Sequence, residues 1–253
     1  MNFITLTEEN IYKEHICCAI SDKKCKSGYE EKKEWLKNQI SQGYVFCKLD
    51  ARAKVFIEYC PSEIAYLPVN ASNYMVINCF WVSGSYAGKG YGKYLLDKCI
   101  GDARLKGKDG VVILCSDKKK PFMSDKKFFI KQNFKVCDTA KPYFELLYLS
   151  FTDNSKIPTF LNNVREGTCD DNGGFKVYYS SACPFNDYHV NIVQKQFAEE
   201  NGILYESVKL DSREKAIKGP SAYTNYSLFY RGRFITHELN FKKFQKIIDD
   251  IKK

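Results

Sequence analysis

A glycine-rich loop between a strand-like and a helix-like segment constrains this chain most. Gly88, Gly90 and Gly92 follow residues 74–82, which are dense in β-branched and aromatic side chains typical of a strand. Residues 95–103 then place apolar side chains at helical spacing. A helix amino terminus leaves backbone N–H groups unpaired and carries a partial positive charge, and glycines let a ligand approach them closely. The order strand, loop, helix therefore predicts a pyrophosphate cradle.

Two common nucleotide-binding patterns do not match this loop. A dinucleotide-binding fold places an acidic residue about 20 positions further on, at the end of a second parallel strand. Here that residue is Asp109, which follows a helix-like segment. The Gly-Lys-Ser/Thr ending of a P-loop is also missing. The predicted anion is therefore carried by another kind of cofactor.

The segment 78–96, with Ala87 to Leu96 at its centre, resembles motif A of the GNAT N-acetyltransferase family, and residues 127–134 are similar to a later helix-to-strand motif of that family. The resemblance covers about residues 1–152. It implies an α+β fold with a mixed, mostly antiparallel sheet and flanking helices, and an enzyme that transfers an acetyl group from acetyl-CoA to an amine.

The same resemblance implies which residues bind the cofactor. In the family, the long strand before the loop splays from its neighbour and its backbone pairs with the pantetheine arm, while the loop amides hold the pyrophosphate. The matching positions are the strand residues Phe80, Trp81 and Val82, the loop residues Gly88, Lys89, Gly90, Tyr91 and Gly92, and Lys93. Lys89 and Lys93 could add positive charge near the phosphates, although exposed lysines at a helix start are commonly solvated residues.

Two departures affect the expected chemistry. Ala87 replaces the arginine or glutamine that usually opens the loop motif, and Phe129 replaces the tyrosine that often protonates the leaving thiolate. Ser124, Cys115 or a water could supply that proton instead. Glu58 and Glu63, on or beside the third predicted strand, are candidate bases for the amine, with exposed strand carboxylates as the alternative.

A second, smaller unit is predicted after a polar linker at 153–174. Residues 175–253 have the element order β-α-β-α-β-β-α, and Cys183-Pro184 lies between a strand and a helix, where a thioredoxin-like α/β domain keeps its redox centre. A cysteine at a helix start is expected to have a lowered pKa. Asn186 replaces the second cysteine of the usual pair, so Cys183 is at most a monothiol. The combination resembles the bacterial YoaP-like acetyltransferases.

Local patterns predict the remaining elements. We expect helices at 8–20, 29–40, 124–132, 186–201 and 212–218 and in the last residues of the chain, and strands at 3–6, 44–49, 54–60, 111–115, 134–137, 143–151, 176–180, 204–209, 227–230 and 234–238. Residues 159–165 are expected to form one or two helical turns.

Composition bears on where the protein is located and on what it binds. The eleven cysteines are scattered, which favours free thiols in a cytoplasmic protein, and the spacing of cysteines and histidines predicts no metal site. No secretory signal or bilayer-spanning run is seen. The net charge is +9, yet the most basic run, 118–120, lacks the interleaved aromatic residues of single-strand binders.

These observations give a leading and an alternative hypothesis. The leading one is an N-acetyltransferase acting on a small-molecule or peptide amine, as a monomer or homodimer, without nucleic-acid or membrane partners. A basic binding protein is a weaker reading. The alternative is a thiol-dependent redox or adaptor protein that uses Cys183 and has a catalytically weakened first domain.

Overall fold

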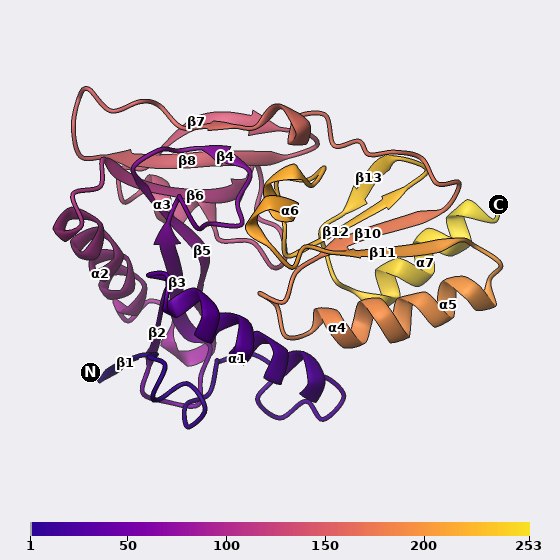
Figure 1. Ribbon diagram of the computed structural model, residues 1–253, viewed down its shortest axis with the longest axis horizontal. Coiled ribbons are helices and arrows are strands. Elements are labelled where there is room, and N and C mark those ends of the chain that lie inside the picture. The colour runs from indigo at the N-terminus through magenta and orange to yellow at the C-terminus, as the bar shows by residue number, and fades with distance from the viewer. Residues whose placement is uncertain (1) are drawn as a thin grey trace.

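The computed structural model describes residues 2–253 and contains two large sheets that lie side by side and a small two-stranded sheet (Figure 1). The strands are β1 (Phe3–Thr5), β2 (Val45–Leu49), β3 (Val55–Pro61), β4 (Val69–Asn70), β5 (Tyr74–Val82), β6 (Gly110–Ser116), β7 (Lys135–Ala140), β8 (Phe144–Ser150), β9 (Thr159–Phe160), β10 (Phe175–Tyr179), β11 (Tyr205–Lys209), β12 (Tyr226–Tyr230) and β13 (Arg233–Thr236). The α-helices are α1 (Lys26–Ile40), α2 (Tyr91–Leu105), α3 (Lys126–Ile130), α4 (Asn186–Tyr188), α5 (Lys195–Glu200), α6 (Arg213–Lys218) and α7 (Phe241–Ile251). A π-helical turn, His189–Gln194, joins α4 to α5, and short 3-10 turns occupy Gly84–Tyr86 and Asn162–Val164.

The first sheet has the strand order β1-β2-β3-β5-β6-β8-β7. Its neighbouring strands are antiparallel except for β5 and β6, which confirms the predicted mixed, mostly antiparallel sheet. The parallel pair is short: Tyr74–Ile77 of β5 pairs with Gly110–Ile113 of β6. Both strands continue beyond this pairing, β5 to Val82 and β6 to Ser116, so they separate after Ile77.

A β-bulge coincides with this separation. Ile77 lies opposite Tyr59 on β3, whereas Cys79 lies opposite Glu58, so Asn78 is an extra residue on β5. A bulge bends its strand and increases the local twist. The second half of β5 therefore stays paired with β3 and leaves β6.

Two layers cover the first sheet. On one face, α2 and α3 pack through the apolar stripe that the sequence predicted for α2, with Leu95, Leu96, Cys99 and Ala103 all buried. On the other face lie α1 and residues 7–25, with Ile11, Ile16 and Leu36 in the core. The cores on the two faces are separate clusters of buried side chains.

The helix predicted at 8–20 is wrong. Residues 8–12 form turns, and Cys17 and Ala19 have positive φ values of 64° and 54°, which an α-helix does not contain. Thr7 and Asn10 exchange hydrogen bonds that close a local turn, at 2.8 Å and 3.3 Å. Polar side chains that bond nearby backbone compete with helix formation. The buried Ile11 and Ile16 hold the segment on the sheet instead.

The second sheet has the order β11-β10-β12-β13. Strand β10 is parallel to β11 and antiparallel to β12, which is antiparallel to β13. The α4–α5 helix and α7 pack on one face of this sheet, through Val190, Ala198, Phe244 and Ile248. Phe234 of β13 belongs instead to the core that includes Phe144 of β8, so apolar packing joins the two sheets.

Residues 153–174, predicted as a linker, contact both sheets. Strand β9 pairs with β4, and Arg165 forms two hydrogen bonds with the Asp138 carboxylate on β7, at 3.0 Å and 2.7 Å. Thr168 forms a bridge with Arg233 on β13. Of the one or two helical turns predicted at 159–165, one is present as the 3-10 turn Asn162–Val164, and the first two residues form β9 instead.

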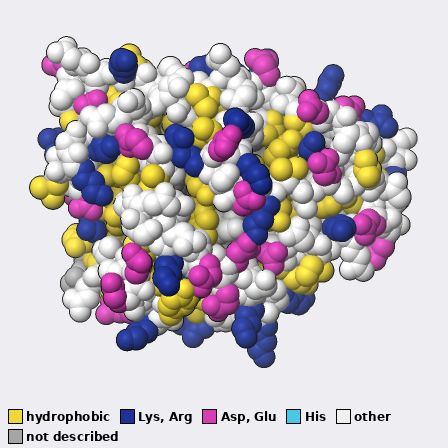
Figure 2. All heavy atoms as spheres, viewed as in Figure 1, with side chains coloured by type: hydrophobic (Ala, Val, Ile, Leu, Met, Phe, Trp, Pro, Cys, Tyr) yellow, Lys and Arg dark blue, Asp and Glu magenta, His cyan; other side chains and the backbone are white. Residues whose placement is uncertain are grey.

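The surface carries mixed charges on the face shown in Figure 2, where basic and acidic side chains alternate between small apolar areas. Within residues 2–253, no helix combines the length and apolar character needed to cross a membrane.

His237 joins the two units at a buried contact. Its side chain is 1% exposed, its Nε2 donates to the backbone carbonyl of Pro121 at 2.9 Å, and its Nδ1 accepts from the Tyr143 hydroxyl at 2.6 Å. Burial lowers the pKa of His237 to about 4. The native contact therefore requires the neutral imidazole.

We expect acid to weaken this contact. The folded-state pKa of His237 is lower than its ordinary value of 6.5, so the unfolded chain binds the proton more tightly and stability falls as the pH drops from about 6.5 to about 4. Between pH 7 and pH 5 the free energy of unfolding should fall by about 2 kcal/mol from this group alone. Urea unfolding of the wild type and of His237→Gln measures it, and the variant should lose that part of the pH dependence. An unchanged pH profile in His237→Gln contradicts the assignment.

Candidate functional site

A groove of about 530 Å³ runs from the end of β5 to the start of α2. Three segments line it: the end of β5, the glycine loop with the start of α2, and the chain before α3. The lining residues are Phe80, Trp81, Val82, Tyr86, Ala87, Gly88, Gly90, Gly92, Lys93, Lys119, Met123, Ser124, Asp125 and Phe128.

The glycine loop presents open backbone to this groove. Gly88 and Gly90 have φ values of 77° and 83°, a region that disfavours side chains, and no atom lies within 4 Å of the place where a Cβ would be. Gly90 is the N-cap of α2 and has no side chain to bond the first free N–H groups. An anionic group can therefore approach these amides directly.

Most of the predicted cofactor-binding residues meet in this groove, but two do not. Phe80, Trp81, Val82, Gly88, Gly90, Gly92 and Lys93 line it. Lys89 is exposed outside the lining, and Tyr91 packs its ring against Tyr86 and Phe3, with centroid distances of 5.6 Å and 6.2 Å. Lys93 also forms an ion pair with Asp97 at 2.8 Å.

Phe129, which replaces the tyrosine of the family motif, is buried. Its ring is 0% exposed and packs against Phe80, Phe128 and Phe134. The groove wall is formed by its neighbour Phe128, which stacks on Phe80 with centroids 5.1 Å apart. The helix predicted at 124–132 begins only at Lys126, with Asp125 as its cap, which places Ser124 in the loop before it.

The sequence did not point to several other groove residues. Tyr86, Lys119, Met123 and Asp125 line the groove although none belongs to the glycine motif. Lys119 comes from the basic run 118–120. The tertiary fold brings this loop to the groove together with the glycine loop, and no local signal predicts that.

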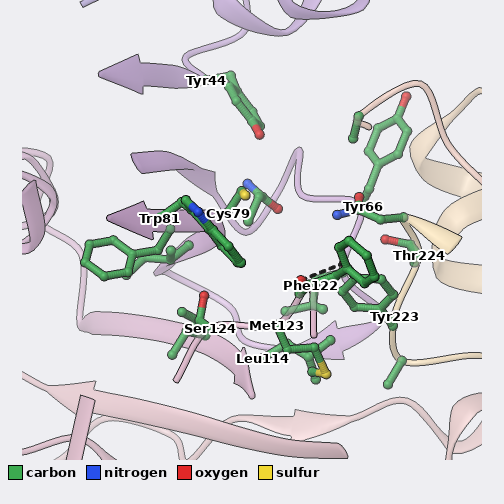
Figure 3. Close-up of a pocket in the computed structure, with 18 of the residues that line it drawn as sticks. Tyr44, Tyr66, Cys79, Trp81, Leu114, Phe122, Met123, Ser124, Tyr223 and Thr224 are labelled. Carbon is green, nitrogen blue, oxygen red and sulfur yellow. Dashed lines mark hydrogen bonds between the residues drawn. The ribbon is translucent and has the colours of Figure 1, made fainter. Parts of the chain in front are cut away.

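A second, enclosed cavity of about 60 Å³ adjoins the groove. In Figure 3, Trp81 and Ser124 lie on one side of it and Tyr66, Phe122, Tyr223 and Thr224 on the other, with Tyr44 extending toward it. Both units contribute to its wall. The lining residues are Trp35, Gln39, Tyr44, Ile64, Tyr66, Leu67, Ile77, Asn78, Cys79, Phe80, Trp81, Ile113, Leu114, Phe122, Met123 and Ser124 from the first unit, and Ala182, Ala222, Tyr223, Thr224 and Asn225 from the second.

The groove and the cavity share four residues. Phe80, Trp81, Met123 and Ser124 line both spaces. A thioester bound along the groove and an amine bound in the cavity would meet at these residues. Of the proposed proton donors, Ser124 lies at this meeting point, whereas Cys115 is fully buried in the core.

Glu58 is buried behind the cavity wall. It is 1% exposed, so the alternative of an exposed strand carboxylate is wrong. Lys32 Nζ lies 2.6 Å from one carboxylate oxygen of Glu58, and the Tyr44 hydroxyl donates to the other at 2.8 Å. Burial alone would lower the pKa of Lys32, but the negative charge of Glu58 outweighs it and the pKa of Lys32 is raised. Burial also raises the pKa of Tyr44 well above its ordinary value. Tyr44 therefore connects Glu58 to the cavity.

Glu63 is not part of the site. Its side chain is 53% exposed and pairs with Lys108 at 3.0 Å, beside a different surface depression.

Cys183 lines a separate depression on the far side of Phe122 and Tyr223. The expected lowering of its pKa is wrong, because burial of the thiol raises the pKa to about 11 and outweighs the hydrogen bond from the Phe185 amide. The helix after it also begins only at Asn186, as the three-residue α4, which leads into the π turn.

Within residues 2–253, no three His, Cys, Asp or Glu side chains are grouped as metal ligands would be.

Comparisons with known proteins identify relatives of both units. Residues 9–121 match the model of the acetyltransferase (GNAT) family, and residues 206–246 match the YoaP-like model. The chain is 42% identical over 252 residues to a Bacillus subtilis (strain 168) protein described as an uncharacterized N-acetyltransferase, YoaP; the match covers 99% of this chain and 100% of that one.

Solved structures are more distant. The PaiA N-acetyltransferase of Thermoplasma acidophilum, solved with coenzyme A, is 20% identical with a TM-score of 0.41, and the match covers 60% of this chain and 100% of that one. An N-acetyltransferase of Staphylococcus aureus Mu50 is 16% identical with a TM-score of 0.41 and the same coverage.

A side chain at Gly90 should abolish the cradle. Gly90→Val forces a β-branched residue to a φ of 83° and places its side chain in front of the open amides. We expect coenzyme A to bind at least about tenfold more weakly by isothermal titration, a loss of about 1.4 kcal/mol. Gly101→Ala is the matched control, since it lies within α2 with open space around it and should leave binding unchanged. Equal affinity of the Gly90 variant and the wild type for coenzyme A would show that the glycine loop does not bind this ligand.

Proposed function

The chain belongs to the YoaP-like proteins of the GNAT N-acetyltransferase family, and we propose that it transfers the acetyl group of acetyl-CoA to an amine bound in the cavity between its two sheets. One observation carries this proposal: the groove suited to the cofactor and the enclosed cavity share Phe80, Trp81, Met123 and Ser124. The transfer would take place at these shared residues.

The residues present fit acetyl-CoA. The open amides around Gly88 and Gly90 suit a pyrophosphate, and Lys93 and Lys119 line the same groove with positive charge. From Cys79 to Val82, β5 has no strand partner on its β6 side within the described chain. Its backbone is therefore free to pair with the amide groups of the pantetheine arm, as the family resemblance implies.

The chemistry needs one proton removed and one returned. The amine nitrogen forms a bond to the acetyl carbon, the carbon–sulfur bond breaks, and the electron pair leaves with the CoA sulfur. The amine proton passes to Tyr44 while the Tyr44 proton passes to Glu58. The CoA thiolate leaves with a hydrogen bond from the Ser124 hydroxyl and takes its proton from solvent. A thiolate is a good leaving group, because thiols have a pKa of about 8.5, so full proton transfer from Ser124 is not required.

Lys32 keeps this relay in place. A buried carboxylate needs a charged partner, and the Lys32 ammonium lies 2.6 Å from Glu58. This ion pair holds the Glu58 carboxylate where it accepts from the Tyr44 hydroxyl. The role of Lys32 is positional, since it does not line the cavity.

Removing the Tyr44 hydroxyl should slow turnover without weakening cofactor binding. Tyr44→Phe keeps the ring in the cavity wall but breaks the path to Glu58. We expect kcat to fall by about 10² and the Kd of coenzyme A to stay unchanged, measured by thiol release and by titration. Glu58→Gln should also lose activity and, with Lys32 left unpaired, lose about 3 to 5 kcal/mol of stability.

Glu63→Gln is the control for these variants, because Glu63 is an exposed carboxylate paired with a lysine outside the site. Its kcat should equal that of the wild type. A Tyr44→Phe enzyme with full kcat would exclude the relay.

We also propose that residues 175–253 form a thioredoxin-like domain joined to the acetyltransferase domain, residues 1–152, by the segment 153–174. The order β11-β10-β12-β13, with one parallel and two antiparallel pairs, supports this, as does Cys183 before the helix. In this proposal the second domain acts as a wall of the acceptor cavity. Since all eleven cysteines are free thiols, we place the protein in the cytoplasm.

Cys183 should react slowly. With a pKa of about 11, its thiolate fraction at pH 7 is about 10⁻⁴, against a few per cent for free cysteine. We expect alkylation by iodoacetamide at least about a hundredfold slower than that of free cysteine, measured by peptide mass spectrometry with Cys183→Ser as the reference for assignment. Alkylation of Cys183 faster than that of free cysteine would support the alternative of a thiol-dependent redox or adaptor protein.

A further inference from the structure

The wall of the acceptor cavity contains no charged side chain. Among the described residues that line it, seven are aromatic and none is Asp, Glu, Lys, Arg or His, although 27% of the chain is charged. Tyr44, which lines the cavity, is hydrogen-bonded to Glu58. The negative charge of Glu58 is balanced by the positive charge of Lys32 in an ion pair. A ligand with several ammonium groups would lose hydration here and gain no counter-ion, so each added charge makes binding less favourable.

The cavity is also small. A volume of about 60 Å³ corresponds to roughly four to six water positions at about 10 to 15 Å³ each. This is enough for one ring or a short chain. An oligosaccharide or a folded polypeptide could not enter it.

Two residues that line this small space carry buried polar atoms without partners. Within residues 2–253, the Trp81 Nε1 and the Gln39 Oε1 have no hydrogen-bond partner, although both atoms are buried and both residues line the cavity. The Gln39 side chain is 6% exposed. Buried polar atoms without partners call for a water or a ligand. The Trp81 indole N–H needs an acceptor, and the Gln39 oxygen needs a donor.

We propose that the acceptor is a small aromatic monoamine whose flat, uncharged body carries a group that both donates and accepts hydrogen bonds. Its ring lies among Trp81, Phe122 and Tyr223, where aromatic side chains can stack on it. Its single amine points toward Tyr44. An uncharged wall favours the neutral amine, which is the nucleophilic form. This inference rests on the proposed function, because it identifies the occupant of the same cavity.

Binding tests the inference independently of turnover. Titration of tyramine and of putrescine into the wild-type protein saturated with coenzyme A compares an aromatic monoamine carrying a hydroxyl with an aliphatic diamine. We expect tyramine to bind at least about tenfold more tightly, a difference of about 1.4 kcal/mol. Equal or tighter binding of putrescine, or no binding of tyramine, overturns the proposal. Acetyl transfer is measured separately, so loss of activity with selective tyramine binding would contradict the proposed function and leave this inference standing.

Gln39 offers a sharper test. Gln39→Glu places a carboxylate in the wall and should reduce the preference for tyramine over putrescine by about tenfold. Gln42→Glu is the matched control, since Gln42 is exposed two residues beyond the end of α1 and should leave the preference unchanged. Gln39→Leu removes the acceptor without adding charge; it should weaken tyramine and leave phenethylamine, which lacks the hydroxyl, unaffected. If Gln39→Leu weakens both amines equally, or if both glutamate variants change the preference alike, Gln39 does not contact the acceptor and the proposal fails.

Discussion

The separation of β5 from β6 after Ile77 is the constraint on which the site depends. One extra residue, Asn78, shifts the register against β3 and turns the second half of β5 away from β6. A sheet that stayed paired to Val82 would have a closed, flat surface there. The separation exposes one edge of β5 to the cofactor groove and, at the same point, opens the space that the second unit closes into a cavity.

The same bulge accounts for the position of the buried ion pair. Glu58 lies on β3 beside the register shift, opposite Cys79, and points into the layer between the sheet and α1. A charged pair in such a place contributes little to stability compared with apolar packing. Glu58 accepts a hydrogen bond from Tyr44, whose ring lines the cavity, so the ion pair is linked to that space.

Local sequence patterns were sufficient for the cofactor side of the site and insufficient for the acceptor side. The strand at 74–82, the glycine loop and the stripe of α2 depend on neighbours in sequence, and all three are present in the structure. The helix at 8–20 failed because Thr7 and Asn10 favour a turn, and the lowered pKa of Cys183 failed because burial outweighs the end of a short helix. The cavity brings Gln39 and Tyr223 together from different units, which no local pattern can predict.

The short loop Ala222–Asn225 contributes four residues to the cavity although it lies far along the chain from the transferase motifs. Two proteins that agree throughout residues 9–121 can therefore differ in this part of the cavity wall. If the cavity holds the acceptor, as we propose, grouping relatives by their transferase region alone would place proteins with unlike acceptors in one class, and substrate assignments passed between them should weigh this distant loop first.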